Sequence, residues 1–249
     1  MENSAAICYK AKQRLRSIRG TKMGIAPRKP QRPPLTLPLL KTEAKKFIAA
    51  FGNKHTKLYG VTDGKAVGTY VEAKFNIYLQ ERYTYNEGNA ASGIDFPELE
   101  VDVKVTSMEQ PQSSCPFKSA EQKIYGLGYN LLVFVYDKAD DAAAKAAHLE
   151  FKHIVFVYRD QTADWQTTNG LLGILERKGN KDDVVAFLEE RRIPLDEIGR
   201  ERLAQRILKE TPKQGYLTIS NALRWRLQYG RVITIAAGPK QKGIENLLA

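Results

Sequence analysis

The feature that most limits the fold is a set of three strand-like segments of two kinds. Residues 99–105 alternate strictly, with leucine and valine on one face and charged residues on the other. Two later runs, LLVFVY at 131–136 and HIVFVY at 153–158, are apolar throughout, which is typical of strands buried on both faces. Together they predict a mixed β-sheet that is covered on both sides.

Helical patterns surround these strands. Residues 65–82 carry an apolar residue every four positions, and helices are also expected over 182–192 and 196–210, each followed by a proline. Ser119 and Gln122 have the spacing of a capping box, which predicts a short helix that ends near Gly126 or Gly128. The expected fold class is therefore α/β (α+β), with a mixed sheet flanked by helices.

Three further segments have weaker patterns. The alanine-rich stretch 138–150 is interpreted as a connection with some helical character. Residues 220–229 are expected to form a helix and 231–236 a strand. With the helix at 196–210, this order also fits a helix-turn-helix with a wing, although such a pattern is common.

The charge is concentrated at the two ends of the chain. Of the formal net charge of +11, residues 1–50 contribute +10 and residues 200–242 contribute +8, so the remainder is acidic. Basic ends around an acidic centre suit a protein that binds a polyanion and holds a divalent cation. The alternative is a basic soluble protein with solvated tails.

The chain is expected to comprise three parts. Residues 1–40 form a basic arm that is rich in proline, because five of the 11 prolines fall between positions 27 and 38. Residues 41–160 are expected to form the core of the fold, and residues 161–249 a mostly helical C-terminal region with possible elements for DNA binding or dimerisation. The first part is expected to be extended or partly helical.

Several classes of protein are disfavoured by what the sequence lacks. The two cysteines are far apart and form no CxxC pair, which argues against a disulfide framework or a zinc site. No apolar run has the length of a membrane span, and we expect a soluble, cytoplasmic protein. The sequence has no phosphate-binding GxxxxGK[ST] loop and only three scattered histidines, so any chemistry falls to the carboxylates.

Carboxylates and one lysine gather in the stretch GIDFPELEVDVKVTS at 93–107. Asp102 and Lys104 are two apart on the expected strand, so their side chains leave the same face. A bend at Phe96-Pro97 can bring Asp95 beside that strand, and Glu72 lies on the flank of the preceding helix. Two aspartates sharing a divalent ion suit Mg²⁺, with Mn²⁺ as a substitute, and such a site hydrolyses phosphodiesters. The alternative is an amphipathic surface strand, with Glu72 as an ordinary boundary residue.

These residues resemble a known family. Asp95 followed by Asp102-Val103-Lys104 is similar to the D…(D/E)xK motif of the PD-(D/E)XK nucleases, and DFPELEVDVK looks like the active-site segment of the MutH-type nicking endonucleases. The close match covers residues 93–106, and a looser one spans 65–136. The resemblance departs from the common pattern in having Ile94 where proline usually precedes the first aspartate.

The resemblance implies a restriction-endonuclease-like core of the αβββαβ type and dependence on Mg²⁺. It also implies hydrolysis that leaves a 5′-phosphate and a 3′-hydroxyl. Asp95 and Asp102 would be the metal ligands, Lys104 the catalytic lysine and Glu72 an auxiliary acidic residue.

Several polar residues after the catalytic strand are candidates for contacts with DNA. Ser113, Ser114, Lys118, Gln122 and Lys123 follow the strand directly, with a plain polar connection as the alternative. Gln122 has a second interpretation as the capping partner of Ser119. Arg224 and Arg226 in the basic C-terminal segment are also candidates, against solvated arginines beside a core tryptophan.

The hypothesis is a type II restriction endonuclease that cuts double-stranded DNA at a specific sequence. A homodimer is expected if the DNA site is palindromic, and a cognate DNA methyltransferase is expected as its functional partner. Two alternatives remain open: a MutH-like repair nickase, and a DNA-binding protein on an inactive nuclease fold.

Overall fold

The computed structural model describes residues 32–88, 93–115, 118–220 and 225–249. By its internal contacts the chain divides into two units, Met1–Arg32 and Pro33–Ala249. Of the basic, proline-rich arm expected over residues 1–40, residues 1–31 lie outside the described residues, whereas Leu37 to Leu40 form the start of helix α2 (Leu37–Phe51).

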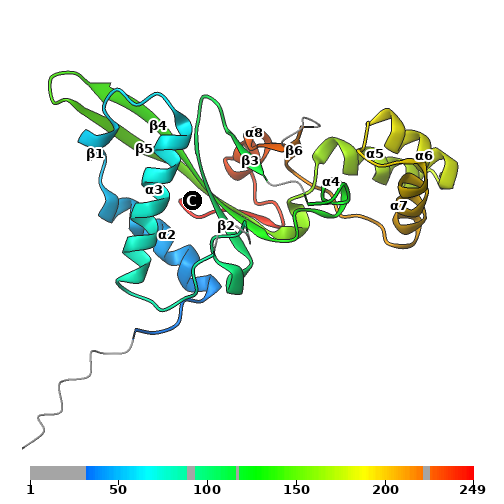
Figure 1. The fold of residues 1–249 in the computed structure, drawn as a ribbon, viewed down its shortest axis with the longest axis horizontal. Helices are drawn as coiled ribbons and strands as arrows, with labels where there is room; N and C mark the ends of the chain where they lie inside the picture. The colour runs from blue at the N-terminus through cyan, green and yellow to red at the C-terminus, as the bar shows by residue number, and fades with distance from the viewer. Residues whose placement is uncertain (1–31, 89–92, 116–117, 221–224) are drawn as a thin grey trace, which may run out of the picture. The chain divides into compact units, whose positions relative to one another are not determined.

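A mixed five-stranded sheet forms the centre of the second unit, as the sequence predicts (Figure 1). Its strand order is β1-β5-β4-β2, and β8 pairs with β5. Strand β2 runs parallel to β4, whereas the other pairs are antiparallel. The strands are β1 (Lys54–His55), β2 (Val101–Ser107), β4 (Asn130–Asp141), β5 (Ala146–Val157) and β8 (Ile244–Asn246).

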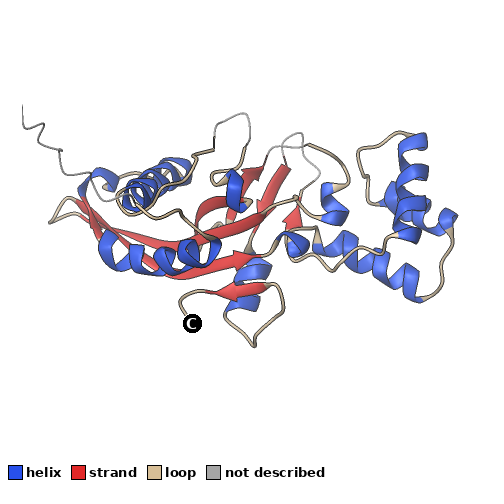
Figure 2. Cartoon of the chain, turned by 90° about the horizontal axis from the view of Figure 1, so that it is seen from below, coloured by secondary structure: helices blue, strands red, loops and turns tan. Residues whose placement is uncertain are grey.

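Both faces of this sheet are buried, as the two continuous apolar runs predict. Helices α2 (Leu37–Phe51) and α3 (Gly64–Gln80) cover one face, where Phe47, Phe75 and Phe134 pack together. Figure 2 shows these helices in blue beside the red strands. Because alternate residues of β4 point to opposite faces, Leu132 and Phe134 enter this core while Leu131 and Val133 enter the other.

A second, smaller sheet contributes to the other core. Strands β3 (Gln112–Cys115), β7 (Trp225–Gln228) and β6 (Thr218–Ile219) pair in that order, and α8 (Gly230–Ala236) follows β7 directly. Apolar residues from these elements and from the position just before β6 pack with the main sheet: Cys115, Leu217, Ile219, Leu227, Val232 and Ile233. The short sheet therefore lies against the same face that carries Leu131 and Val133.

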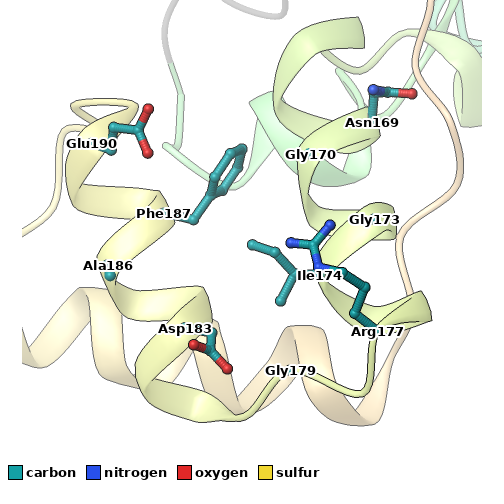
Figure 3. Close-up of a pocket in the computed structure, with 10 residues that line it drawn as sticks. All are labelled: Asn169, Gly170, Gly173, Ile174, Arg177, Gly179, Asp183, Ala186, Phe187 and Glu190. Carbon is teal, nitrogen blue, oxygen red and sulfur yellow. The ribbon is translucent and has the colours of Figure 1, made fainter.

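Four helices form a third cluster. These are α4 (Gln122–Tyr125), α5 (Trp165–Glu176), α6 (Lys181–Glu190) and α7 (Glu197–Lys209), with α5 to α7 in yellow tones in Figure 1. A pocket of about 620 Å³ opens between α5 and α6 beside Phe187, with Arg177, Asp183 and Glu190 among its lining residues (Figure 3). None of the acidic residues singled out in the sequence lines it.

Three secondary-structure predictions are wrong. Residues 138–150 form the ends of β4 and β5 and the turn between them, because both strands continue into one long hairpin. The expected helix at 220–229 is replaced, in its described part, by β7, and the expected strand at 231–236 is helix α8. The order of elements therefore does not support a helix-turn-helix with a wing.

The core also differs in detail from the order that the resemblance implies. Within the described residues between α3 and α4 there are two strands, β2 and β3, where an αβββαβ core would have three. Strand β3 leaves the main sheet to pair with β7, so β2 remains at the sheet edge. In the described part of the chain, no helix is long and apolar enough to cross a membrane.

Candidate active site

Strand β2 carries valines on one face and charged residues on the other. Val101, Val103 and Val105 face α3 and are buried, while Asp102 and Lys104 share the opposite face with Leu131 and Val133 of β4. The alternating pattern of the sequence is therefore confirmed, but both faces of β2 are covered. As a result Asp102 is only 2% exposed, which an amphipathic surface strand would not produce.

A tight turn brings Asp95 to the same place. Phe96 exchanges backbone hydrogen bonds with Val101 around the 3₁₀ turn Pro97–Leu99, and Glu100 closes the turn in the left-handed region, with φ of 51°. The chain thus doubles back, and the Val103 amide donates to Asp95 Oδ2 over 2.7 Å. Because β2 is an edge strand, its outer N–H groups need such partners.

Asp102 and Lys104 form a buried ion pair. Lys104 Nζ lies 2.7 Å from Asp102 Oδ2, and the two side chains are 18% and 3% exposed. Burial raises the pKa of Asp102 to about 7, although the charge of Lys104 opposes that shift. Burial would also lower the pKa of Lys104, but Asp102 outweighs it, so the pKa of Lys104 is raised and the ammonium form is favoured.

The ion pair with Lys104 does not give the Asp102 carboxylate a full set of hydrogen bonds. Asp102 Oδ2 is buried and accepts no hydrogen bond with acceptable geometry, despite the short ion-pair distance. Buried carboxylate oxygens are costly unless they are paired and hydrogen-bonded. The charge of Asp95 raises the pKa of Asp102 further, so a second carboxylate lies close by. A cation between the two aspartates would relieve both effects.

Glu72 joins this cluster from α3. Burial raises the pKa of Glu72, the charge of Asp95 raises it further, and the charge of Lys104 lowers it. Helix α3 approaches β2 closely at Gly68, where a Cβ would lie 3.6 Å from the Val105 carbonyl oxygen. Glu72 is one turn further along α3, so its carboxylate reaches the charges of Asp95 and Lys104.

The residues present fit a hard divalent cation that retains several waters. Among the described residues, no three His, Cys, Asp or Glu side chains form a preformed metal cage. Mg²⁺ commonly takes only one or two carboxylates and completes its shell with water. Asp95 and Asp102 match that donor set, and Asp102 Oδ2 is a buried oxygen that faces the Lys104 ammonium and accepts no well-aligned hydrogen bond.

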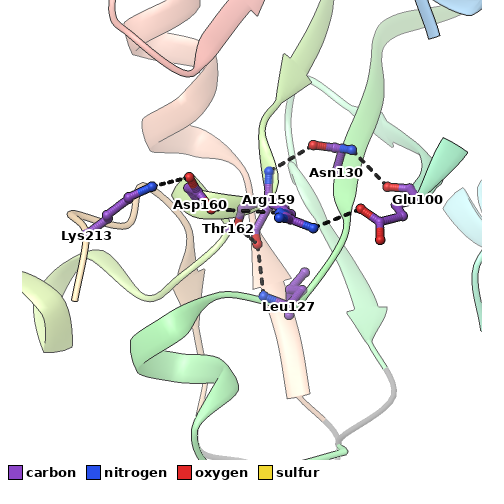
Figure 4. A network of polar contacts seen from close by, with 7 residues as sticks. All are labelled: Glu100, Leu127, Asn130, Arg159, Asp160, Thr162 and Lys213. Carbon is purple, nitrogen blue, oxygen red and sulfur yellow. Dashed lines mark hydrogen bonds and ion pairs between the residues drawn. The ribbon is translucent and has the colours of Figure 1, made fainter. Parts of the chain in front are cut away.

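A polar network holds the start of β2 in place (Figure 4). The Glu100 carbonyl accepts hydrogen bonds from the backbone and side-chain nitrogens of Asn130, and Asn130 Oδ1 accepts from the Arg159 amide. Arg159 also forms an ion pair with the Glu100 carboxylate at 3.0 Å. The turn that carries Asp95 is thereby tied to β4 and to the end of β5.

Gln122 makes structural contacts, and Lys123 is buried. The Gln122 side-chain oxygen accepts from the backbone amides of Lys118 and Ser119, and its nitrogen donates to the Leu127 carbonyl. This arrangement favours the interpretation of Gln122 as a partner of the short helix. Lys123 is 3% exposed, and burial lowers its pKa.

The other candidates for DNA contacts are spread over β3, β7 and the loop between β3 and α4. The Ser113 hydroxyl lies 2.6 Å from the hydroxyl of Tyr229, which is buried. Ser114 and Arg226 are exposed and face each other on β3 and β7, and Lys118 is exposed in the loop. Arg224 lies outside the described residues.

Two residues near the site were missed by the sequence reasoning. A Cβ at Gly88 would overlap the Ile94 carbonyl oxygen, and the Gly88 amide donates to the Asp95 carbonyl over 2.9 Å. Gly88 therefore permits the close backbone approach that positions Asp95. Tyr229 is fully buried, burial raises the pKa of its hydroxyl, and the charge of Asp102 adds to that rise. In the sequence, the signal for Gly88 is only that a glycine stands shortly before the acidic stretch, and Tyr229 has no such signal.

Comparison with known proteins places the chain in a family. The family model described as type II restriction enzyme NspV matches residues 34–246. The chain belongs to the NspV family. It is 59% identical over 200 residues to the type II restriction enzyme NspV of Nostoc sp. (strain ATCC 29411 / PCC 7524), which covers 80% of this chain and 91% of that protein. No solved structure matches it.

Proposed function

We propose that this protein is a type II restriction endonuclease that cleaves double-stranded DNA at a specific sequence with Mg²⁺ as its cofactor, Mn²⁺ being a substitute. The observation that carries the proposal is the buried Asp102 carboxylate, which lies beside Asp95 and is paired with Lys104. The family to which the chain belongs supports the same conclusion, because its model is named for a type II restriction enzyme.

Asp95 and Asp102 would hold the cation. Each is fixed by its backbone: Asp102 by the β2–β4 pairing, and Asp95 by the turn and by the hydrogen bond from the Val103 amide. When bound, Mg²⁺ supplies Lewis acidity to the scissile phosphodiester. The burial of Asp102 strengthens the preference for a cation, because a lone carboxylate is poorly solvated there.

Lys104 and Glu72 would act around this centre. The raised pKa of Lys104 keeps it an ammonium, which orients the attacking water and offsets the negative charge that develops on the phosphoryl oxygens. Glu72 has a pKa raised mainly by burial and is placed to accept a proton or to bind a water at the edge of the site. Asp95, Asp102 and Lys104 would then correspond to the PD-(D/E)XK motif.

The reaction itself is a hydrolysis. The oxygen of water forms a bond to phosphorus while the bond from phosphorus to the 3′ oxygen breaks. The attacking water passes one proton to solvent or to a basic group, and the departing 3′ oxygen takes up one proton from solvent. The second proton of the water stays on the new 5′-phosphate or ionises to solvent. The products are a 5′-phosphate and a 3′-hydroxyl.

A palindromic recognition site would be cut by two copies of the chain, one for each strand. We therefore propose a homodimer on DNA, with a cognate methyltransferase that protects the same sequence in the cytoplasm. Sedimentation of the protein with and without a short cognate duplex measures the first point. Resistance of a methylated duplex to cleavage measures the second.

The deciding experiment is digestion of unmethylated phage DNA with Mg²⁺, with Mn²⁺ and with EDTA, followed by sequencing of the ends. Asp102→Asn and Lys104→Met are compared with Asp137→Asn and Lys152→Met, which alter a half-buried Lys–Asp pair on β4 and β5. We expect discrete double-strand breaks that require the metal and vanish only in the first two variants. Nicks confined to one strand would favour a repair nickase, and binding without cleavage would leave a DNA-binding protein.

A further inference from the structure

The outward face of the small sheet carries a row of polar side chains. In the β3–β7 register, Ser114 pairs with Arg226 and Gln112 pairs with Gln228. Because residues two apart on a strand share a face, all four side chains belong to the same side of the ribbon. The alternate positions, Cys115, Leu227 and Ile219, are buried in the core.

These polar side chains have unused hydrogen-bonding capacity. Ser114, Arg226 and Gln228 are exposed and Gln112 is partly exposed. Throughout the part of the chain that the structure describes, the side chains of Gln112, Arg226 and Gln228 form no hydrogen bond or ion pair with one another or with other residues. Two amides and a guanidinium therefore point outward without an internal partner.

The ribbon is tied to the active-site strand. Strand β3 follows β2 after only four residues, 108–111, and the Thr106 hydroxyl at the end of β2 accepts from the Gln112 amide over 2.9 Å. On the inner face, the hydroxyl of Ser113 contacts that of Tyr229. The polar row is therefore held in a fixed relation to Asp102 and Lys104.

We infer that this outward face enters the major groove of double-stranded DNA and reads base edges beside the cleavage site, an inference that rests on the proposed function. A β-ribbon fits the major groove, where glutamine amides pair with adenine N6 and N7, and arginine pairs with guanine O6 and N7. Gln112, Arg226 and Gln228 supply these two kinds of group. The face carries one positive charge, whereas a surface built for phosphates gathers several.

The test uses the full-length protein and a duplex that contains the cleavage sequence mapped from phage DNA. Gln112→Ala, Arg226→Ala and Gln228→Ala are compared with Gln205→Ala and Arg202→Ala, which change the same residue types on the exposed surface of α7. We expect kcat/KM on the cognate duplex to fall by roughly 5- to 150-fold in each ribbon variant and to stay unchanged in the two controls. Each ribbon variant should also lose discrimination at one particular base pair.

Arg226→Lys separates base reading from phosphate binding. Lysine keeps the charge but lacks the planar fork, so a base contact should stay weakened while a phosphate contact should be restored. Binding to non-cognate DNA, measured in a Lys104→Met background, should be the same for Gln228→Ala and for the unaltered ribbon.

Two results would overturn the inference while leaving the proposed function intact. In the first, the ribbon variants cleave DNA as fast as the α7 controls and keep the same sequence preference. In the second, the Arg226→Lys protein has full cleavage activity. Failure of the unaltered protein to cut any DNA with Mg²⁺ or Mn²⁺ would instead overturn both proposals. Melting temperatures of the single ribbon and α7 variants should match that of the unaltered protein, because each of these substituted side chains is at least partly exposed.

Discussion

The pair formed by Asp102 and Lys104 should reduce the stability of the protein. We consider the double replacement Asp102→Leu with Lys104→Met, which keeps similar volumes and removes both charges. Exchanging a buried ion pair for apolar residues is commonly neutral or stabilises a protein by about 1–4 kcal/mol, because desolvation exceeds the attraction between the charges. Lys104→Met alone leaves the carboxylate unpaired and should destabilise the protein by about 3–5 kcal/mol at pH 8.

The pKa of Asp102 gives an independent magnitude and a pH dependence. A carboxyl whose pKa rises from 3.8 in the unfolded chain to about 7 in the native state binds its proton more tightly when folded. Its contribution to stability is therefore most favourable below about pH 4, falls as the pH rises, and reaches its minimum above about pH 7. The full cost is about 4 kcal/mol, from three pH units at about 1.4 kcal/mol each.

The assay is urea unfolding in EDTA at pH 5 and pH 8 for the unaltered protein and both variants. The free energy of unfolding of the double variant should equal or exceed that of the unaltered protein at pH 8, and the difference should shrink at pH 5. Taking this difference cancels the other groups that titrate. A double variant that is 3 kcal/mol less stable at pH 8 would show that the pair is a structural ion pair, and the reasoning would be refuted.

Three further changes test the scaffold around the site. Gly88→Ala should lower the single-turnover cleavage rate by about tenfold to a hundredfold, because its methyl group would displace the segment of Asp95; an unchanged rate would contradict this. Glu43→Gln should cost about 1–3 kcal/mol in urea unfolding at pH 7, because this carboxylate is 3% exposed and accepts hydrogen bonds from two tyrosines and a lysine. The pKa of Glu43 is lowered in the folded protein by these hydrogen bonds despite its burial, so the loss should vanish as the pH falls through that pKa, and a loss that persists at pH 2 would refute it. Asp164→Ala should cost about 2–4 kcal/mol, because it removes the cap of α5 and leaves the Ile219 amide without its acceptor; a melting temperature within 1 °C of the unaltered protein, about the experimental error, would count against it.

The elements around the site were predictable because their signals are local. The alternation of β2 and the spacing of apolar residues along α3 depend on neighbouring positions alone. The approach of Asp95 to β2 also followed from a short stretch, since Pro97 begins the turn and the chain has only a few residues in which to reverse. The roles of these residues in catalysis stay predictions.

The errors arise where distant pairing decides. The alanine-rich stretch favours a helix by propensity, but Ala146 and Ala147 are buried in a long hairpin with β4. Strand β7 exists because Leu227 pairs with Ser113, more than a hundred residues earlier. Helix α2 was missed for another reason: Pro38 stands in its first turn, where proline is tolerated, and was counted with the prolines of the arm.

The most direct test of the central claim is the single-turnover rate at which a short cognate duplex is cut, measured against Mg²⁺ concentration. The account predicts that Asp102→Asn lowers the maximal rate by at least about a hundredfold, while the half-buried Asp137→Asn control cuts like the unaltered protein. The released strand should carry a 5′-phosphate. Cleavage by Asp102→Asn at close to the normal rate would contradict the account, because the chemistry would then lie elsewhere.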